Sequence, residues 1–193
     1  MKTVYLDPGH GGADPGALGP SGLRESDMAL DVCLRIKKLL DPYVNCFLTR
    51  SDDRFLTLSQ RPAIANKGEA DAFLSYHFNA AESPNTASSW EIFTTRGQNR
   101  SDKLATAIGL EHAKQFPDQR QRQDWSDGDL DKEAGFAVIR GTDHPSCLME
   151  GEFIHTTHGE TLIKNPKNRQ KMAVAAATGI LNFLGVTPTT CKC

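Results

Sequence analysis

Short apolar runs alternate along the sequence with longer amphipathic stretches, and this alternation restricts the chain to few architectures. Runs typical of strands lie at residues 4–6, 44–48, 72–78, 90–94, 136–139 and 147–149. Helical periodicity predicts helices at 25–40, 56–66 and 166–184, and another that Ser101 caps at its start. Residues 117–134 are polar and are predicted to form an exposed loop. Strands that alternate with helices favour an α/β fold, so we expect a three-layer sandwich: a mainly parallel, twisted sheet of about six strands with helices on both faces.

Length and composition indicate one globular domain, which we place at residues 1–185, followed by a flexible tail at 186–193. Hydrophobic residues make up 38% of the 193 residues and charged residues 24%, which argues against disorder. Lys and Arg number 22 and Asp and Glu 24, so the net charge is −2. The chain therefore lacks the basic surface typical of nucleic-acid-binding proteins. We find no apolar run of about 18 residues, and expect no membrane insertion.

The five cysteines do not suggest a disulfide framework, because their number is odd and their spacing irregular. Cys33, Cys46 and Cys147 lie in apolar stretches and are predicted to be small core residues. Cys191 and Cys193 end the chain, where a frayed tail is expected rather than a metal site or a disulfide. The N-terminal residues show no secretory signal peptide, so we expect synthesis in the cytoplasm.

Four ionisable residues occupy positions where catalytic side chains collect in α/β folds. His10 follows the first strand in a glycine-rich loop, Glu25 opens the first helix, and His77 and Glu150 lie near strand ends. Two histidines and a carboxylate suit a catalytic zinc with an open fourth position, and a further carboxylate suits its general base. Three of them also have a structural interpretation: a polar turn for His10, a helix-dipole contact for Glu25, and a hydrogen-bonded core histidine for His77. Glu150, between apolar residues, needs a partner or a task.

A second cluster competes for the role of metal site. His155 and His158 are three residues apart and would share a helix face, with Glu160 close behind. The segment around Thr156 resembles a loop and helix cap, which favours a structural interpretation of these residues.

Several motifs in order make the chain resemble the zinc-dependent N-acetylmuramoyl-L-alanine amidases, which cut peptide stems from peptidoglycan. The resemblance covers about residues 2–184 and rests on LDPGHGG at 6–12 with DPGA at 14–17, Glu25, LTR at 48–50, LSQR at 58–61 continuing to residue 66, ADAFLSYHFNA at 70–80, VIR at 138–140, and the segment 145–150 that ends in Glu150. One departure is clear. The family usually shows Glu-x-Gly-Phe, whereas this chain has EGEF at 150–153, which would place Glu152 as a second carboxylate beside the site.

This resemblance implies a mechanism and a substrate. His10, Glu25 and His77 would hold Zn²⁺, and Glu150 would take a proton from the zinc-bound water and give it to the departing amine of L-alanine. The bond cut would join the lactyl group of N-acetylmuramic acid to L-alanine of the stem peptide. Peptidoglycan would be the partner, with no obligate protein partner. Two alternatives remain open: a non-catalytic peptidoglycan-binding module, and a zinc peptidase that acts on the stem peptide.

The resemblance also suggests a setting. Without a visible export signal or wall-binding module, the chain fits a phage or prophage endolysin that acts on the bacterial cell wall. Regulated family members carry a long helical insertion that plugs the metal cleft, and the stretch 80–89 is too short for one. We therefore expect an open site.

Overall fold

The chain folds around a single mixed sheet. The structure is a computed structural model and describes residues 1–81, 88–126 and 128–187. The described residues form seven strands in the order β2-β1-β3-β7-β4-β5, with β6 paired to β4 beside this path. All pairs are parallel except β4 with β7. The strands are β1 (Thr3–Pro8), β2 (Asn45–Leu48), β3 (Ala72–Asn79), β4 (Ser89–Thr94), β5 (Arg120–Gln121), β6 (Lys132–Glu133) and β7 (Ser146–Phe153).

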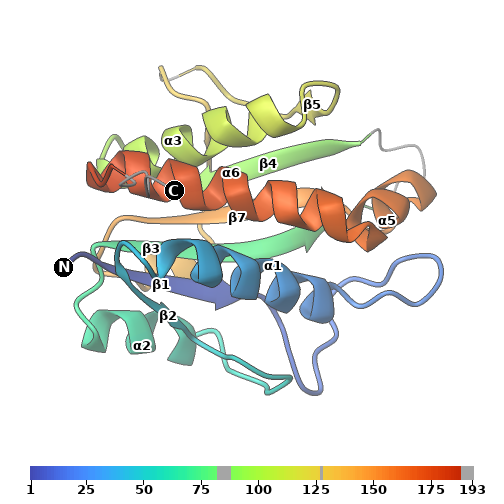
Figure 1. Cartoon of the computed structure of the whole chain (residues 1–193), viewed down its shortest axis with the longest axis horizontal. Helices are drawn as coiled ribbons and strands as arrows, with labels where there is room; N and C mark the ends of the chain where they lie inside the picture. Colours follow the sequence, from blue (N-terminus) through green and yellow to red (C-terminus); the bar gives the residue numbers. More distant parts are fainter. Residues whose placement is uncertain (82–87, 127, 188–193) are drawn as a thin grey trace, which may run out of the picture.

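Helices cover both faces of the sheet, which confirms the predicted three-layer α/β sandwich. On one face α1 (Glu25–Leu40) and α3 (Arg100–Gln115) pack on either side of α6 (Pro166–Leu184), as Figure 1 shows. On the other face α2 (Gln60–Lys67) packs against the short α4 (Ala137–Arg140). The remaining helix, α5 (Thr157–Lys164), leads from β7 into α6.

Alternation along β3 divides the core between the two faces. Leu74, Tyr76 and Phe78 belong to the larger cluster under α1, α3 and α6, whereas Phe73 belongs to the smaller cluster with Val138 of α4. Side chains two residues apart share a face of a strand, so His77 lies on the side of Phe73. This face, where α2 and α4 are short, carries the chemistry described below.

Several predicted elements differ from the structure. The predicted strand at 136–139 is wrong, because residues 137–139 lie in α4 and Phe136 is its N-cap; a short apolar run fits a buried helix as well as a strand. Helix α5 was not predicted as a helix, although the Thr156 side chain caps it by accepting from the Gly159 amide. Helix α3 is capped by Asn99 instead of Ser101, and α2 begins at Gln60 rather than at residue 56.

The segment 117–134 is more structured than the predicted exposed loop. It contains the short strands β5 and β6, and it buries Leu130 and Asp131. The prediction of core cysteines is confirmed for Cys33, Cys46 and Cys147, which are buried free thiols. Cys191 and Cys193 lie outside the described residues, as do 188–193 of the predicted tail, while Val186 packs against the main core.

Candidate active site

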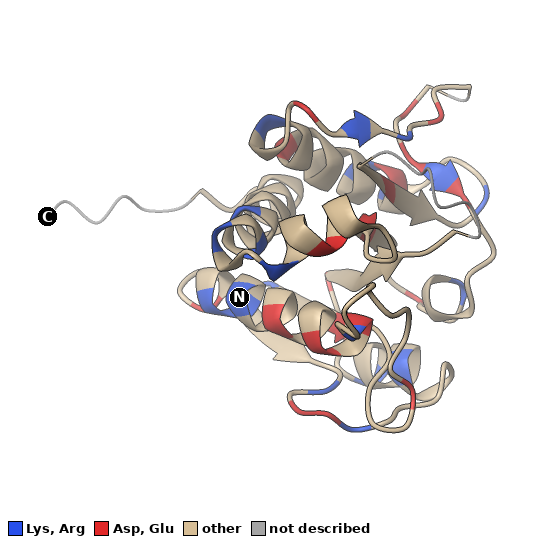
Figure 2. Cartoon of the chain, turned by 90° about the vertical axis from the view of Figure 1, so that its right-hand side faces the viewer, with Lys and Arg blue, Asp and Glu red and all other residues tan. Residues whose placement is uncertain are grey.

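The glycine-rich loop after β1 positions His10 near the carboxyl ends of the parallel strands β1, β3 and β7, on the side of the sheet that faces the viewer in Figure 2. His10 has a φ of 58°, in the left-handed region that few non-glycine residues adopt. Gly9 before it must lack a side chain, because a Cβ there would lie 2.3 Å from Cε1 of the His77 ring. The loop thus brings the two imidazoles together.

Glu25 joins both histidines. Its Oε1 lies 3.1 Å from Nε2 of His10 and 2.9 Å from Nδ1 of His77, and the carboxylate is almost fully buried. The same carboxylate accepts hydrogen bonds from the amides of Ala17 and Phe78, at 2.8 and 3.1 Å. Backbone amides from two segments therefore fix the orientation of Glu25 before any ligand binds.

Asp14 orients the other nitrogen of His10. Its Oδ2 lies 2.8 Å from Nδ1 of His10. A carboxylate that holds the far nitrogen of a histidine fixes the ring orientation and strengthens the near nitrogen as a metal ligand. Asp14 was not predicted as a functional residue; its spacing of four residues from His10 within the motif was the available signal.

The three side chains meet the geometric requirement for one ion. One ligand atom from each of His10, Glu25 and His77 lies within 4.8 Å of the other two. Two imidazole nitrogens and one carboxylate oxygen are a donor set typical of catalytic zinc, so the residues present fit this metal.

Electrostatics within the cluster follow from these contacts. Burial alone would raise the pKa of Glu25, but the hydrogen bonds and charges of His10 and His77 outweigh it and hold this pKa far below its usual range. Burial would lower the pKa of His10, but Glu25 and Asp14 outweigh it and raise this pKa. Without a metal, the cluster therefore favours an ionised carboxylate next to a protonated imidazole, and a metal must displace that proton.

Glu150 lies next to this cluster in the sheet. It stands opposite His77 in the β3–β7 register and opposite Glu91 in the β4–β7 register. Its Oε2 is buried and has no hydrogen-bond partner in the described part of the chain. Burial, followed by the charges of Glu25 and Glu91, raises the pKa of Glu150 well above its usual value. A carboxyl group with a free oxygen and a raised pKa is suited to proton transfer.

A cavity of about 320 Å³ opens beside the two histidines. It is lined by His10, His77 and the charged residues Asp7, Asp14 and Arg61, together with apolar side chains, namely Phe55, Leu56, Leu58 and Val138. Phe55 and Leu58 are mostly exposed, at 55% and 63%. Exposed apolar side chains at the edge of a polar cluster are typical of a ligand site. Most of the stretch 80–89, on which the expectation of an open site depended, lies outside the described residues.

The expectation that Glu152 adds a second carboxylate to the site is wrong. Glu152 is fully buried and accepts hydrogen bonds from the Ser89 amide and from Nε2 of Gln119, at 3.2 and 2.7 Å, and also from the Ser88 hydroxyl. It ties β7 to the start of β4 and to the segment that follows α3. The local bulge between β3 and β7 after His77 accompanies this change of partners.

The competing cluster does not assemble. His155 precedes α5, His158 lies in its first turn, and Glu160 accepts hydrogen bonds from the amide and hydroxyl of Ser21. Among described residues, two groups bring three such ligand atoms within 4.8 Å of one another, and neither includes these three residues.

Comparison with known proteins agrees with the site. Residues 4–182 match the family model described as N-acetylmuramoyl-L-alanine amidase. The chain belongs to this amidase family. Among the relatives of this amidase-family chain, YqiI of Bacillus subtilis is 37% identical over 186 residues, which cover 94% of the chain and 84% of YqiI. The N-acetylmuramoyl-L-alanine amidase AmiC of Neisseria meningitidis serogroup B is 28% identical over 96% of the chain, which spans 53% of AmiC.

The fold of the amidase-family chain also matches solved structures. The catalytic domain of CwlV, an N-acetylmuramoyl-L-alanine amidase from Bacillus (Paenibacillus) polymyxa, superimposes with a TM-score of 0.87. The two chains are 29% identical, and the match covers 97% of this chain and all of that domain. The order of strands and helices around the cluster is therefore that of a known amidase catalytic domain.

Two buried arginines hold the histidine-bearing loop of this family member. Nη1 of Arg61 lies 3.0 Å from Oδ1 of the buried Asp7 and 2.7 Å from the Pro8 carbonyl, and Nη2 lies 2.8 Å from the His10 carbonyl. Nη2 of Arg50 donates to the Gly9 carbonyl at 2.6 Å. The sequence marked both arginines only as members of family motifs. The structure shows that they satisfy the backbone carbonyls which the turn around His10 leaves unpaired.

Replacing Arg61 by Leu is expected to destabilise the fold by about 3–5 kcal/mol, because Asp7 would keep a buried charge without its guanidinium partner. In a chain of this length, this loss lowers Tm by roughly 10 °C. Thermal unfolding measures it. Arg54→Leu is the matched control: Arg54 is exposed and pairs with the exposed Asp52, so its loss is expected to leave Tm almost unchanged. If both variants lowered Tm by the same amount, this would contradict the stabilising role of Arg61 in the buried pair with Asp7.

Proposed function

We propose that this amidase-family chain hydrolyses the amide bond between the lactyl group of N-acetylmuramic acid and L-alanine of the peptidoglycan stem peptide. One observation supports this most directly: the ligand atoms of His10, Glu25 and His77 lie within 4.8 Å of one another, with the unpartnered carboxyl oxygen of Glu150 on the adjacent strand. A metal site with an unligated acid beside it is suited to hydrolysis by water.

The residues divide the work of this reaction. His10, Glu25 and His77 would hold Zn²⁺, and Asp14 keeps the His10 ring in its binding orientation. When bound, zinc supplies a positive charge that polarises the lactyl carbonyl and lowers the pKa of water to about 7. A cation held by Glu25 would offset one of the charges that raise the pKa of Glu150 and so favour its ionised form. Ionised Glu150 would then take a proton from the attacking water on its free oxygen and give it to the leaving amine of L-alanine. No side chain needs to act as a nucleophile.

Product analysis tests the proposal against both alternatives. Purified sacculi are digested with zinc-loaded protein, and the products are identified by mass spectrometry. The amidase reaction releases stem peptides with a new L-alanine amino terminus and leaves the glycan strands intact. New termini inside the stem peptide would indicate a zinc peptidase instead. Binding to sacculi without any released peptide would indicate a binding module and would contradict the proposal.

The apolar wall of the cleft is expected to contact the substrate next to the bond that is cut. Replacing Leu58 by Ala removes an exposed side chain beside the histidines. We expect KM for a soluble muramyl-peptide to rise about tenfold with little change in kcat, because burying this side chain against substrate contributes roughly 1.5 kcal/mol. Steady-state kinetics separate the two constants.

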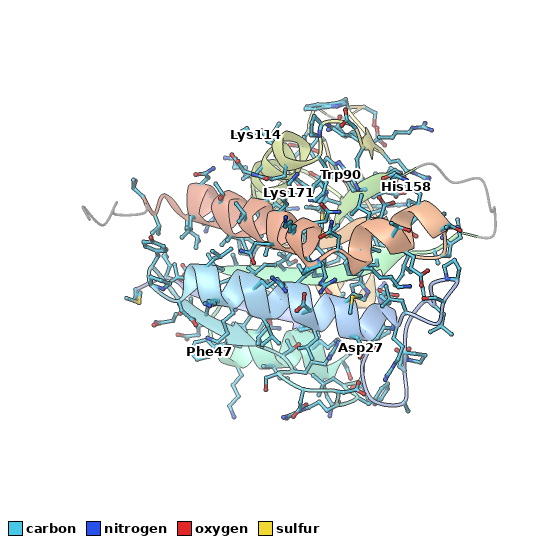
Figure 3. The ribbon with its side chains drawn as sticks, turned by 45° about the vertical axis from the view of Figure 1, so that its right-hand side comes forward. Asp27, Phe47, Trp90, Lys114, His158 and Lys171 are labelled. Atoms are coloured by element: carbon cyan, nitrogen blue, oxygen red, sulfur yellow. The ribbon has the colours of Figure 1, made fainter. Side chains whose placement is uncertain are left out.

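Phe47 provides the matched control for Leu58. It is also exposed, at 48%, but it stacks on Tyr5 and is not among the residues that line the cavity. Figure 3 labels Phe47 on β2 and Asp27 in the first turn of α1. Phe47→Ala is expected to leave both kinetic constants within twofold of the wild-type values, since the ring lies outside the cleft. Parallel rises in KM for the two variants would contradict a substrate contact at Leu58.

We also propose that the chain acts at the bacterial cell wall, where its substrate lies. Among described residues, none of the helices is long and apolar enough to cross a membrane. The endolysin role and the lack of an obligate protein partner stay predictions. To test the endolysin role, the purified protein is added to whole bacterial cells and to isolated sacculi, and lysis of the cells and digestion of the sacculi are measured.

A further inference from the structure

A second group of three acids lies away from the histidines. Asp102 belongs to the first turn of α3, and Asp129 and Asp131 belong to the segment between β5 and β6. One carboxylate oxygen from each lies within 4.8 Å of the other two. Two oxygens bound to the same Ca²⁺ are at most about 5 Å apart, twice the usual bond length, so a single ion can contact all three carboxylates.

Asp131 gives an independent indication of a missing ligand. The residue is only 3% exposed, and its Oδ1 has no hydrogen-bond partner in the described part of the chain, while Oδ2 accepts from the Thr94 hydroxyl at 2.5 Å. Asp129 shows the same division: Oδ2 accepts from Nε2 of Gln98 at 2.9 Å, and Oδ1 is buried without a hydrogen-bond partner. In each residue, one oxygen is held by the protein and the other is left without a donor. A buried carboxylate oxygen in this state is costly unless a proton or a cation satisfies it.

The pKa of Asp131 also indicates that the group of three aspartates binds a proton or a cation. Burial raises the pKa of Asp131 to about 7, together with a carboxyl–carboxyl hydrogen bond to Asp129, which needs a shared proton, and the charges of Asp129 and Asp102; the hydrogen bond from Thr94 opposes this shift. Near neutral pH, the group therefore holds either a shared proton or a cation. A divalent cation would satisfy Oδ1 of Asp129 and Oδ1 of Asp131 at the same time. A single shared proton would satisfy both only by forming a hydrogen bond between the two carboxylates.

We propose that Asp102, Asp129 and Asp131 form a binding site for a single Ca²⁺ ion. The donors are all oxygens, which suits a hard cation and distinguishes this site from the nitrogen-containing cluster of His10, Glu25 and His77. Ca²⁺ accepts several protein carboxylates in flexible geometry, whereas Mg²⁺ keeps most of its water and seldom uses a cage of this kind. The Thr94 side chain sits behind the site and holds Asp131 in place.

The proposed ion would fasten a segment that reaches the active site. Lys132, next to Asp131, lies 3.1 Å from Oε2 of Glu91, and Arg122 of the same segment lies 2.6 Å from Oε1. Glu91 stands opposite Glu150 in the sheet. Calcium bound between α3 and this segment would therefore stabilise the two cations that pair with Glu91, the neighbour of the proposed general base in the sheet.

Thermal unfolding and calorimetry of the full chain test the proposal. The buffer is stripped of other metals and contains a fixed zinc concentration, and CaCl₂ is added to 1 mM. We expect Tm to rise by about 5 °C, since ligand that binds only the folded state stabilises it. Titration calorimetry is expected to show one Ca²⁺ per chain. The Asp129→Asn/Asp131→Asn variant is expected to lose both effects, yet to unfold without Ca²⁺ at or above the wild-type Tm, because it lacks the carboxylate repulsion.

Two further variants separate this site from the rest of the molecule. His77→Ala disables the proposed zinc site and is expected to keep the Ca²⁺-dependent shift, so this test stands apart from the proposed hydrolysis. Asp52→Asn removes an exposed carboxylate elsewhere and is expected to keep it as well. If the wild type shows neither a Ca²⁺-dependent rise in Tm nor heat of Ca²⁺ binding, the proposal is wrong and the three aspartates hold a shared proton instead. A response to Mg²⁺ alone would also overturn it, as would an unchanged Ca²⁺ response in the double variant.

Discussion

Replacing Glu150 by Gln is expected to lower kcat/KM on purified sacculi by about 10²–10⁴-fold, the usual contribution of a general base. The amide has nearly the shape of the carboxyl group but cannot take the proton of the attacking water. Since Glu150 is not among the three clustered ligands, zinc content is expected to remain at about one ion per chain. Release of stem peptides and metal analysis of the same preparation give the two values.

Glu69→Gln is the control for this experiment, because Glu69 is exposed at the end of α2 and contributes nothing to the cleft. Its activity is expected to match the wild type. The assignment of Glu150 fails if E150Q retains full activity. Loss of zinc together with activity would instead make Glu150 a ligand, and would contradict the separation between ligands and base.

Replacing His77 by Ala is expected to remove most of the bound zinc and to lower activity by more than about 10³-fold. Residues that only orient a ligand already contribute 10–100-fold to metal affinity or activity, and the loss of one of three direct ligands has a larger effect. Metal analysis after dialysis against a weak chelator measures the stoichiometry. His158→Ala is the matched control: His158 lies in the first turn of α5, outside the cluster, and its loss is expected to leave zinc bound.

The same cluster predicts the direction of the pH dependence. The pKa of His10 is raised, so a proton competes with zinc to a higher pH than at an ordinary histidine. Zinc affinity is therefore expected to fall as the pH drops through the neutral range, and binding is expected to release a proton there. Titration calorimetry in buffers of different ionisation enthalpy counts that proton. Zinc binding that is independent of pH between 6 and 8 would contradict the raised pKa.

Local patterns predicted much of this molecule. The regular apolar period of α1 and α6 and the apolar runs of β1 and β3 specify their own structure, because residues that share a face must be buried together. The prediction failed at 136–139, where four residues are too few to distinguish a helix from a strand. It also failed for Asp131, whose burial depends on contacts with Thr94, far away in the sequence.

The sequence by itself determined the alternation of strands and helices, the glycine-rich loop after β1, and the four residue types that the chemistry needs. Only the tertiary structure decided that ligand atoms of His10, Glu25 and His77 lie close enough to bind one ion. It also decided that Glu152 accepts a hydrogen bond from Gln119, whereas Glu150 lies opposite His77 in the sheet. The grouping of three aspartates elsewhere likewise depends on the fold. The physical reason is the distance along the chain over which each kind of signal acts. Periodicity and turn chemistry act over a few neighbouring residues, whereas a metal site depends on distances between atoms that are brought together only when the sheet has formed.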